Sequence, residues 1–83
     1  MGIDMKKEKM YMDLEYDLIC EYIKIRKNSK MTQQELAEST NIIRTTVARI
    51  ESGANSPHLK TMLELLEPLG YTLKIVPIDK DND

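Results

Sequence analysis

The sequence lacks the residues that disulfide scaffolds, metal sites and most enzyme active sites require. Its one cysteine, Cys20, has no partner in the chain, and His58 is the one histidine. An internal disulfide is therefore excluded, and neither a metal site nor a nucleophile–base pair can be named. A Gly-rich phosphate loop is also absent. We predict no enzymatic activity, no cofactor and no metal. We expect Cys20 to be a core or half-buried residue of the first helix.

Long apolar runs are missing as well. No stretch approaches the ~20 apolar residues of a membrane-spanning helix, and no signal peptide is visible. We therefore expect a cytoplasmic protein without membrane contact. The 83 residues make one small domain. A domain of this size lies near the lower limit for a core that is stable without disulfides or metal.

Charged residues are unevenly distributed along the chain. There are 12 basic and 14 acidic residues, a net charge of −2. Residues 24–60 hold seven basic and three acidic side chains. Residues 1–23 hold three basic and six acidic side chains, and residues 61–83 hold two basic and five acidic ones. A local basic region is enough to bind phosphates, so the acidic balance of the whole chain does not exclude DNA. It disfavours a general nucleic-acid coat, which would be basic throughout.

Residues 32–53 have the layout of two short helices joined by a tight turn. Thr32 is a good N-cap, and Glu35 stands three residues later, so the two can form a capping box. Leu36 then points into the core. Asn41 is expected to take the left-handed backbone conformation that ends the first helix and redirects the chain.

The second helix of this segment divides into an apolar and a polar side. Ile42, Val47 and Ile50 have the spacing of a buried face, and Gly53 ends the helix. In a helix-turn-helix the second helix lies in the DNA major groove, where arginine can pair with guanine. Solvated surface residues are the alternative interpretation of the polar side. We predict DNA base contacts by Arg44, Thr45, Thr46 and Arg49.

This segment resembles the Xre family, the phage-repressor and Cro-type helix-turn-helix proteins. The resemblance covers about residues 18–70. It implies a mainly α, lambda-repressor-like helix-turn-helix bundle of four to five short helices, to which the sequence adds one C-terminal β-strand. Ile43 stands where the family has a Ser or Thr cap on the recognition helix, and Asn41 stands where Gly is usual. The missing cap costs about 1 kcal/mol of helix stability. The matching residues are Thr32-Gln33, Glu35-Leu36-Ala37, Val47, Ile50-Glu51, Gly53, Ser56-Pro57 and Leu63 to Gly70.

The resemblance also implies which residues would contact the DNA backbone. In the family, a glutamine at the first position of the helix before the turn anchors a phosphate, and Gln33 occupies that position. For Asn55, Ser56 and Lys60, which follow Gly53, exposure on the surface without a DNA contact is the alternative interpretation. Arg26 and Glu51 have the family's spacing for a structural ion pair between the first helix and the recognition helix. The expected backbone contacts are Thr32, Gln33, Asn55, Ser56 and Lys60.

Amphipathic helices are predicted on both sides of this motif. Apolar residues at three- and four-residue spacing predict one helix over about residues 13–27. Ser56 as N-cap and Pro57 at the first position predict another over residues 57–67, which Pro68 ends. The helix-turn-helix domain would then span residues 13–70, preceded by an N-terminal arm of residues 1–12.

Residues 71–77 change to the two-residue period of a β-strand. Tyr71, Leu73 and Ile75 alternate with Thr72, Lys74 and Val76. A single strand needs a partner, and the simplest is the same strand of a second copy, paired about a two-fold axis. We therefore predict that Tyr71, Leu73 and Ile75 form a dimerisation strand. Pairing with the N-terminal arm and an unpaired extended tail are the alternatives. Residues 78–83 are predicted to be disordered.

Two functions fit these features. The first is a sequence-specific transcriptional repressor that binds a palindromic operator in double-stranded DNA as a homodimer. The second is an antitoxin that binds a toxin and autoregulates its operon, because the ending Gly70, Thr72, Leu73, Val76 and Pro77 resembles HigA- and HipB-type antitoxins. A basic RNA-cleaving toxin would be attracted to the acidic N-terminal region, for which a solvated helix end is the alternative interpretation. Its acidic residues are Glu8, Asp13, Glu15, Asp17 and Glu21.

Overall fold

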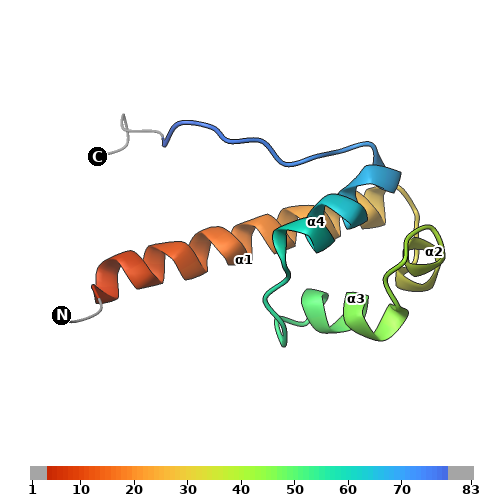
Figure 1. Cartoon of the computed structure of the whole chain (residues 1–83), viewed down its shortest axis with the longest axis horizontal. Helices are drawn as coiled ribbons and strands as arrows, with labels where there is room; N and C mark the ends of the chain where they lie inside the picture. Colours follow the sequence, from red (N-terminus) through yellow and green to blue (C-terminus); the bar gives the residue numbers. More distant parts are fainter. Residues whose placement is uncertain (1–3, 79–83) are drawn as a thin grey trace.

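The computed structural model describes residues 4–78, in which four α-helices and one short 3-10 helix are found (Figure 1). Helix α1 spans Met5–Asn28, α2 spans Gln33–Glu38, α3 spans Arg44–Glu51 and α4 spans Leu59–Leu66, and the 3-10 helix η1 follows at Glu67–Leu69. α1 forms the long axis, and the other helices gather around its C-terminal half. The expected mainly α architecture is confirmed.

The core lies where the four helices meet. Tyr22 of α1, Leu36 of α2, Val47 and Ile50 of α3 and Leu65 of α4 each expose no more than 1% of their surface. These residues hold α2 and α3 in a fixed arrangement against α1. Cys20, in contrast, is exposed, so its expected burial is wrong. It stands two residues from Tyr22, which turns it about 200° around the helix and away from the core.

α1 begins earlier than the sequence pattern predicts. Residues 5–12, expected to form an arm, are the first two turns of this helix, while residues 1–3 lie outside the described residues. Asp4 is the N-cap, and its Oδ1 accepts hydrogen bonds from the N–H groups of Lys6 (3.0 Å) and Lys7 (3.3 Å). These turns are exposed, so they lack the apolar periodicity on which the prediction depended.

The turn between α2 and α3 is made differently from the prediction. The left-handed conformation expected at Asn41 is wrong, because Lys30 (φ 59°) is the one non-glycine residue with positive φ within residues 4–78. Thr40 makes the turn instead. Its Oγ1 donates to the carbonyl of Ala37 and accepts from the N–H of Ile42, both at 3.1 Å. A threonine hydroxyl can thus replace the left-handed residue at this turn.

α4 begins at Leu59 after His58 as N-cap, two residues later than predicted. The expected capping by Ser56 is wrong, because the Ser56 hydroxyl is hydrogen-bonded to the carboxylate of Glu15 on α1. The predicted end is confirmed: the α-helix stops before Pro68, and Gly70 turns the chain with φ 85°.

Residues 71–78 form no β-strand within the described chain, so the expected C-terminal strand is not supported. The N–H of Tyr71 donates to the carbonyl of Leu66 at 3.1 Å, and Leu73 packs against the core. Beyond it, Ile75 is 98% exposed. A strand needs a partner, and residues 5–12 are helical, so this part of the expected arm does not pair with residues 71–78. The disorder predicted for residues 78–83 falls, apart from Ile78, outside the described residues.

None of the helices described within residues 4–78 combines the length and apolar character that a membrane span requires.

Candidate nucleic-acid interface

α3 carries its apolar and polar side chains on two different sides. Val47 and Ile50 are buried, and Arg44, Thr45 and Arg49 are exposed on the opposite side of the helix. Thr46, the fourth predicted base contact, is half-buried and lines a shallow groove beside the loop that follows α3. Three of the four predicted residues therefore share one outward surface, and Thr46 lies at its edge.

The start of α3 has no side-chain cap. Ile43 occupies the N-cap position with φ −75° and ψ 152°, makes no capping hydrogen bond and is 68% exposed. The backbone already has the extended conformation of a capped helix start, so only the hydroxyl is missing.

The start of α2 is fixed by the expected capping box. The N–H of Glu35 donates to Oγ1 of Thr32 at 3.0 Å, and the N–H of Thr32 donates to Oε1 of Glu35 at 2.9 Å. The hydrogen bond from the Thr32 backbone lowers the pKa of the Glu35 carboxyl from 4.5. Gln33 follows as the first residue of the helix, where N–H groups are left without intrahelical partners.

The Glu51 carboxylate connects the motif to α1. Arg26 forms the expected ion pair, with Nε 2.8 Å from Oε2 and Nη2 2.7 Å from Oε1, while its Nη1 donates to the carbonyl of Met31 at 2.8 Å. The Tyr22 hydroxyl donates to Oε2 at 2.8 Å, and Nε2 of Gln33 donates to Oε1 at 3.1 Å. One carboxylate at the end of α3 therefore binds side chains from α1 and from the start of α2.

The protonation of this network is fixed by its hydrogen bonds. Burial opposes charge on Glu51, but the hydrogen bonds from Arg26, Gln33 and Tyr22 outweigh it and hold the pKa of this carboxyl below 4.5. Burial and the hydrogen bond to Glu51 both raise the pKa of the Tyr22 hydroxyl well above 10.0. At neutral pH the Glu51 carboxyl is therefore ionised, and the Tyr22 hydroxyl keeps its proton and donates the hydrogen bond between them.

The loop after α3 supplies the other predicted backbone contacts. The Asn55 amide fits its surroundings when its nitrogen donates to the carbonyl of Ala54 (3.0 Å) and its oxygen accepts from Nε of Arg49 (3.2 Å). Asn55 therefore contacts a predicted base-reading residue. Ser56 is held by Glu15, so a carboxylate lies at the edge of this surface. No sequence pattern indicates this contact, which joins residues 41 positions apart.

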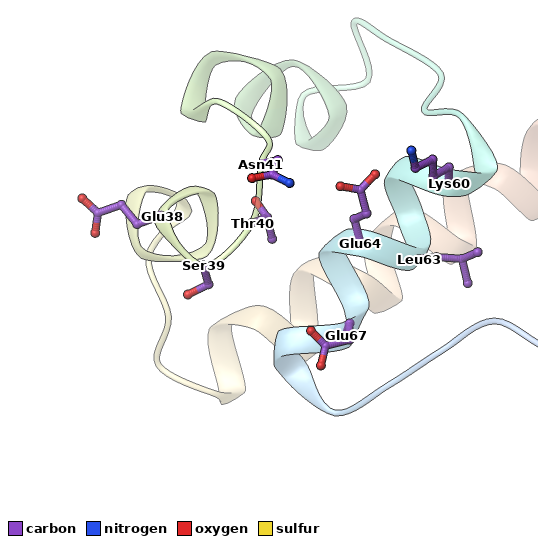
Figure 2. Close-up of a pocket in the computed structure, with 8 residues that line it drawn as sticks. All are labelled: Glu38, Ser39, Thr40, Asn41, Lys60, Leu63, Glu64 and Glu67. Atoms are coloured by element: carbon purple, nitrogen blue, oxygen red, sulfur yellow. The ribbon is translucent and has the colours of Figure 1, made fainter.

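Lys60 lies in another groove, between the α2–α3 turn and α4 (Figure 2). This groove has a volume of about 510 Å³, and its acidic lining residues are Glu64 of α4, Glu67 at the start of η1 and Glu38 at the end of α2. Glu64 stands one helical turn after Lys60 in this groove, and its negative charge makes Lys60 a weaker candidate for phosphate contact than the loop residues.

Comparison with known proteins identifies the family. Residues 23–76, more than half of the chain, match the family model for the helix-turn-helix. The chain is also 40% identical over 70 residues to an uncharacterised HTH-type transcriptional regulator of Haemophilus influenzae, over 84% of this chain and 71% of that protein. The protein therefore belongs to the Xre and Cro-type helix-turn-helix family.

Among solved structures, the chain is similar to a chain of a toxin–antitoxin module from Streptococcus pneumoniae. The TM-score is 0.70 at 30% sequence identity, and the match covers 95% of this chain and 97% of that chain. The similarity therefore includes the flanking helices as well as the helix-turn-helix.

Proposed function

We propose that this protein is a sequence-specific transcriptional repressor that binds a palindromic operator as a homodimer. The observation that carries the proposal is the outward surface of α3, where Arg44, Thr45 and Arg49 lie opposite a buried face. An arginine can donate two hydrogen bonds to one guanine in the major groove. Buried Val47 and Ile50 hold the helix in place, so these side chains would be presented from a rigid element.

Contacts to the DNA backbone would set the orientation of α3. The amide nitrogen of Gln33 carries two hydrogens, so it can donate one to Glu51 and the other to a phosphate. Thr32, Asn55 and Ser56 would contact the neighbouring backbone, and Lys60 would add charge from α4. These contacts position the protein, whereas those of α3 specify the sequence.

A homodimer would supply the second recognition helix. Repressors of this architecture read two half-sites about 34 Å apart, one helical turn of DNA, and an operator with two-fold symmetry matches a two-fold dimer. A single domain of this size would contact one half-site and bind with less specificity.

Selection of bound fragments from random double-stranded DNA tests the proposal. The expected result is one enriched palindrome with half-sites a helical turn apart, bound less tightly by the double variant R44A/R49A. A matched control is K24A/K27A, which removes two exposed charges of the basic region from α1 and should lower affinity for every sequence alike, without relaxing the preference for the palindrome. Enrichment of no sequence, or equal binding by the R44A/R49A variant, would refute the proposal.

A second candidate function is an antitoxin that also represses its own operon. The similarity to the chain from a toxin–antitoxin module favours it. α1 offers an exposed acidic surface at Asp13 and Asp17, to which a basic toxin would be attracted. The test is co-purification with the product of the adjacent small gene, using the full chain and the D13N/D17N variant. Binding by the full chain that is lost in the D13N/D17N variant supports the antitoxin function. If neither the full chain nor the variant binds the gene product, the antitoxin function is refuted and only the repressor function is left.

A further inference from the structure

The loop after α3 folds back on Arg49. The N–H of Gly53, which has φ 83°, donates to the carbonyl of Ile50 at 3.1 Å. The N–H of Ala54 donates to the carbonyl of Arg49 at 2.9 Å, and these two hydrogen bonds around a left-handed glycine form a Schellman motif. The N–H of Asn55 donates to the same Arg49 carbonyl at 3.2 Å. The backbone of Asn55 is therefore held beside Arg49.

The side chain of Asn55 contacts Arg49 as well. Its oxygen accepts from Nε of Arg49 at 3.2 Å, and its nitrogen donates to the carbonyl of Ala54 at 3.0 Å. The opposite orientation of the amide would place its oxygen 3.0 Å from the Ala54 carbonyl oxygen, where two acceptors repel each other, and would leave one weak contact of 3.5 Å with Nη2 of Arg49. The loop backbone and the amide therefore fix Asn55 against the guanidinium.

Asn55 binds the guanidinium at the nitrogen that base recognition can spare. The hydrogen bond uses the single hydrogen of Nε, so the hydrogens of Nη1 and Nη2 stay available. These two nitrogens can donate to O6 and N7 of one guanine. Arg49 is exposed, and within residues 4–78 no other side chain hydrogen-bonds its guanidinium. Without Asn55, this long side chain would lose more rotamer freedom on binding DNA, which lowers affinity for the base.

We propose that Asn55 is a positioning residue for base recognition: it holds the guanidinium of Arg49 so that Nη1 and Nη2 face one guanine of the operator. This deepens the proposed function, because it rests on α3 as the helix that reads bases. A side chain that is fixed before binding loses less freedom in the complex, and the gain applies to guanine, where both nitrogens find acceptors. The second hydrogen of the Asn55 amide nitrogen stays available to a phosphate, so the proposed backbone contact is compatible with this role.

Arg44 provides an internal comparison. It is also exposed on α3, but within the described residues 4–78 its guanidinium makes no hydrogen bond to another side chain. Loss of Asn55 should therefore affect the base pair that Arg49 reads and leave the base pair that Arg44 reads unchanged. Loss of a phosphate contact alone would instead weaken binding to every sequence alike.

Binding of the full chain to base-pair variants of its selected operator tests the role of Asn55. R49A and R44A first identify the base pair that each arginine reads. N55A should then lower the discrimination between guanine and the other bases at the Arg49 base pair by about two- to tenfold, and leave the Arg44 base pair unaffected. N55D keeps an oxygen acceptor for Nε, so it should keep this discrimination while its charge weakens binding to every sequence.

S52A is the matched control for N55A. The Ser52 hydroxyl donates to the backbone carbonyl of Arg49 at 3.1 Å, so this variant removes a contact between the loop and Arg49 but keeps the one to the guanidinium. It should discriminate like the wild type. R49A/N55A should discriminate no less than R49A, because without the guanidinium Asn55 has nothing to position.

Three results would overturn the inference. One is an N55A variant that binds every operator variant more weakly by the same factor, which would leave Asn55 as a backbone contact alone. Another is an equal loss of discrimination in S52A, or a loss at the Arg44 base pair, which would assign the effect to the fold of the loop. The third is an N55D variant that loses discrimination as N55A does.

These failures are distinguishable from failure of the proposed function. If R49A relaxes a base pair that N55A leaves intact, the inference about Asn55 fails alone. If no operator is enriched, or if R49A leaves every base preference unchanged, the proposed function fails and the inference fails with it.

Discussion

The guanidinium of Arg26 binds both oxygens of the Glu51 carboxylate, with Nε 2.8 Å from Oε2 and Nη2 2.7 Å from Oε1. The two side chains are 9% and 7% exposed. This pair joins α1 to the last residue of α3, and Gln33 and Tyr22 share the same carboxylate. α3 is therefore fixed at its C-terminal end by this pair, whereas its N-terminal end at Ile43 has no side-chain cap.

Removal of one partner of this pair is expected to destabilise the fold. Arg26→Ala or Glu51→Ala leaves a buried charge unpaired, and the free energy of unfolding should fall by about 3–5 kcal/mol. Urea unfolding followed by circular dichroism measures it. The apolar double variant R26M/E51L should recover much of the loss, because no buried charge remains. Single variants as stable as the wild type would show that the pair is solvated in solution.

The same carboxylate predicts an acid-sensitive stability. The folded-state pKa of Glu51 lies below its ordinary value of 4.5, so its contribution is present above pH 4.5 and is lost as pH falls through the folded pKa. Urea midpoints measured between pH 7 and strongly acidic pH should decline more steeply for the wild type than for Glu51→Gln. Parallel declines would contradict a charged Glu51 in the folded state.

A side-chain cap added at the start of α3 should stabilise the protein. Ile43 has the backbone conformation of an N-cap but no side-chain oxygen, and it is 68% exposed. Ile43→Ser should raise the free energy of unfolding by about 0.5–2 kcal/mol relative to the matched control Ile43→Ala. Equal thermal midpoints of the two variants would show that the hydroxyl does not reach the first turn of α3.

Glu15 is expected to weaken DNA binding. Its carboxylate holds Ser56, a proposed contact to the DNA backbone, and adds negative charge next to a phosphate. Glu15→Gln removes the charge but keeps a hydrogen-bonding group, so affinity for the selected operator should rise, most of all at low salt. Asp13→Asn, a neutralisation elsewhere on exposed α1, serves as control. An equal rise in both variants would indicate a general charge effect.

Local sequence signals predicted the centre of the fold well. Thr32, Glu35 and Gly53 mark helix ends through contacts with their immediate neighbours, so the structure reproduces the ends that they indicate. Asp4 also marks a helix start, as the N-cap of α1. The turns after it are exposed and lack the apolar period from which a helix is predicted, so this start was not predicted. Thr40 makes the turn in place of Asn41 because its hydroxyl satisfies the backbone groups of Ala37 and Ile42, so no left-handed residue is needed.

Long-range contacts were harder to predict. The Tyr22 hydroxyl meets Glu51 across 29 residues, and Ser56 meets Glu15 across 41. Both depend on how α1 packs against α3 and the following loop, which no local pattern encodes. The alternation in residues 71–77 gives no strand within one chain, because pairing would require a second one.

Sequence specificity of an α3 variant is the most direct test of the central claim that this helix reads bases. Operators are selected from random DNA with wild-type protein and with Arg49→Ala, and the base preferences at each position are compared. We predict that the variant loses preference at one base step in each half-site, symmetrically, and binds the wild-type operator more weakly by about 1–3 kcal/mol. Identical preferences at every position, with affinity unchanged, would contradict the assignment of α3 as the recognition helix.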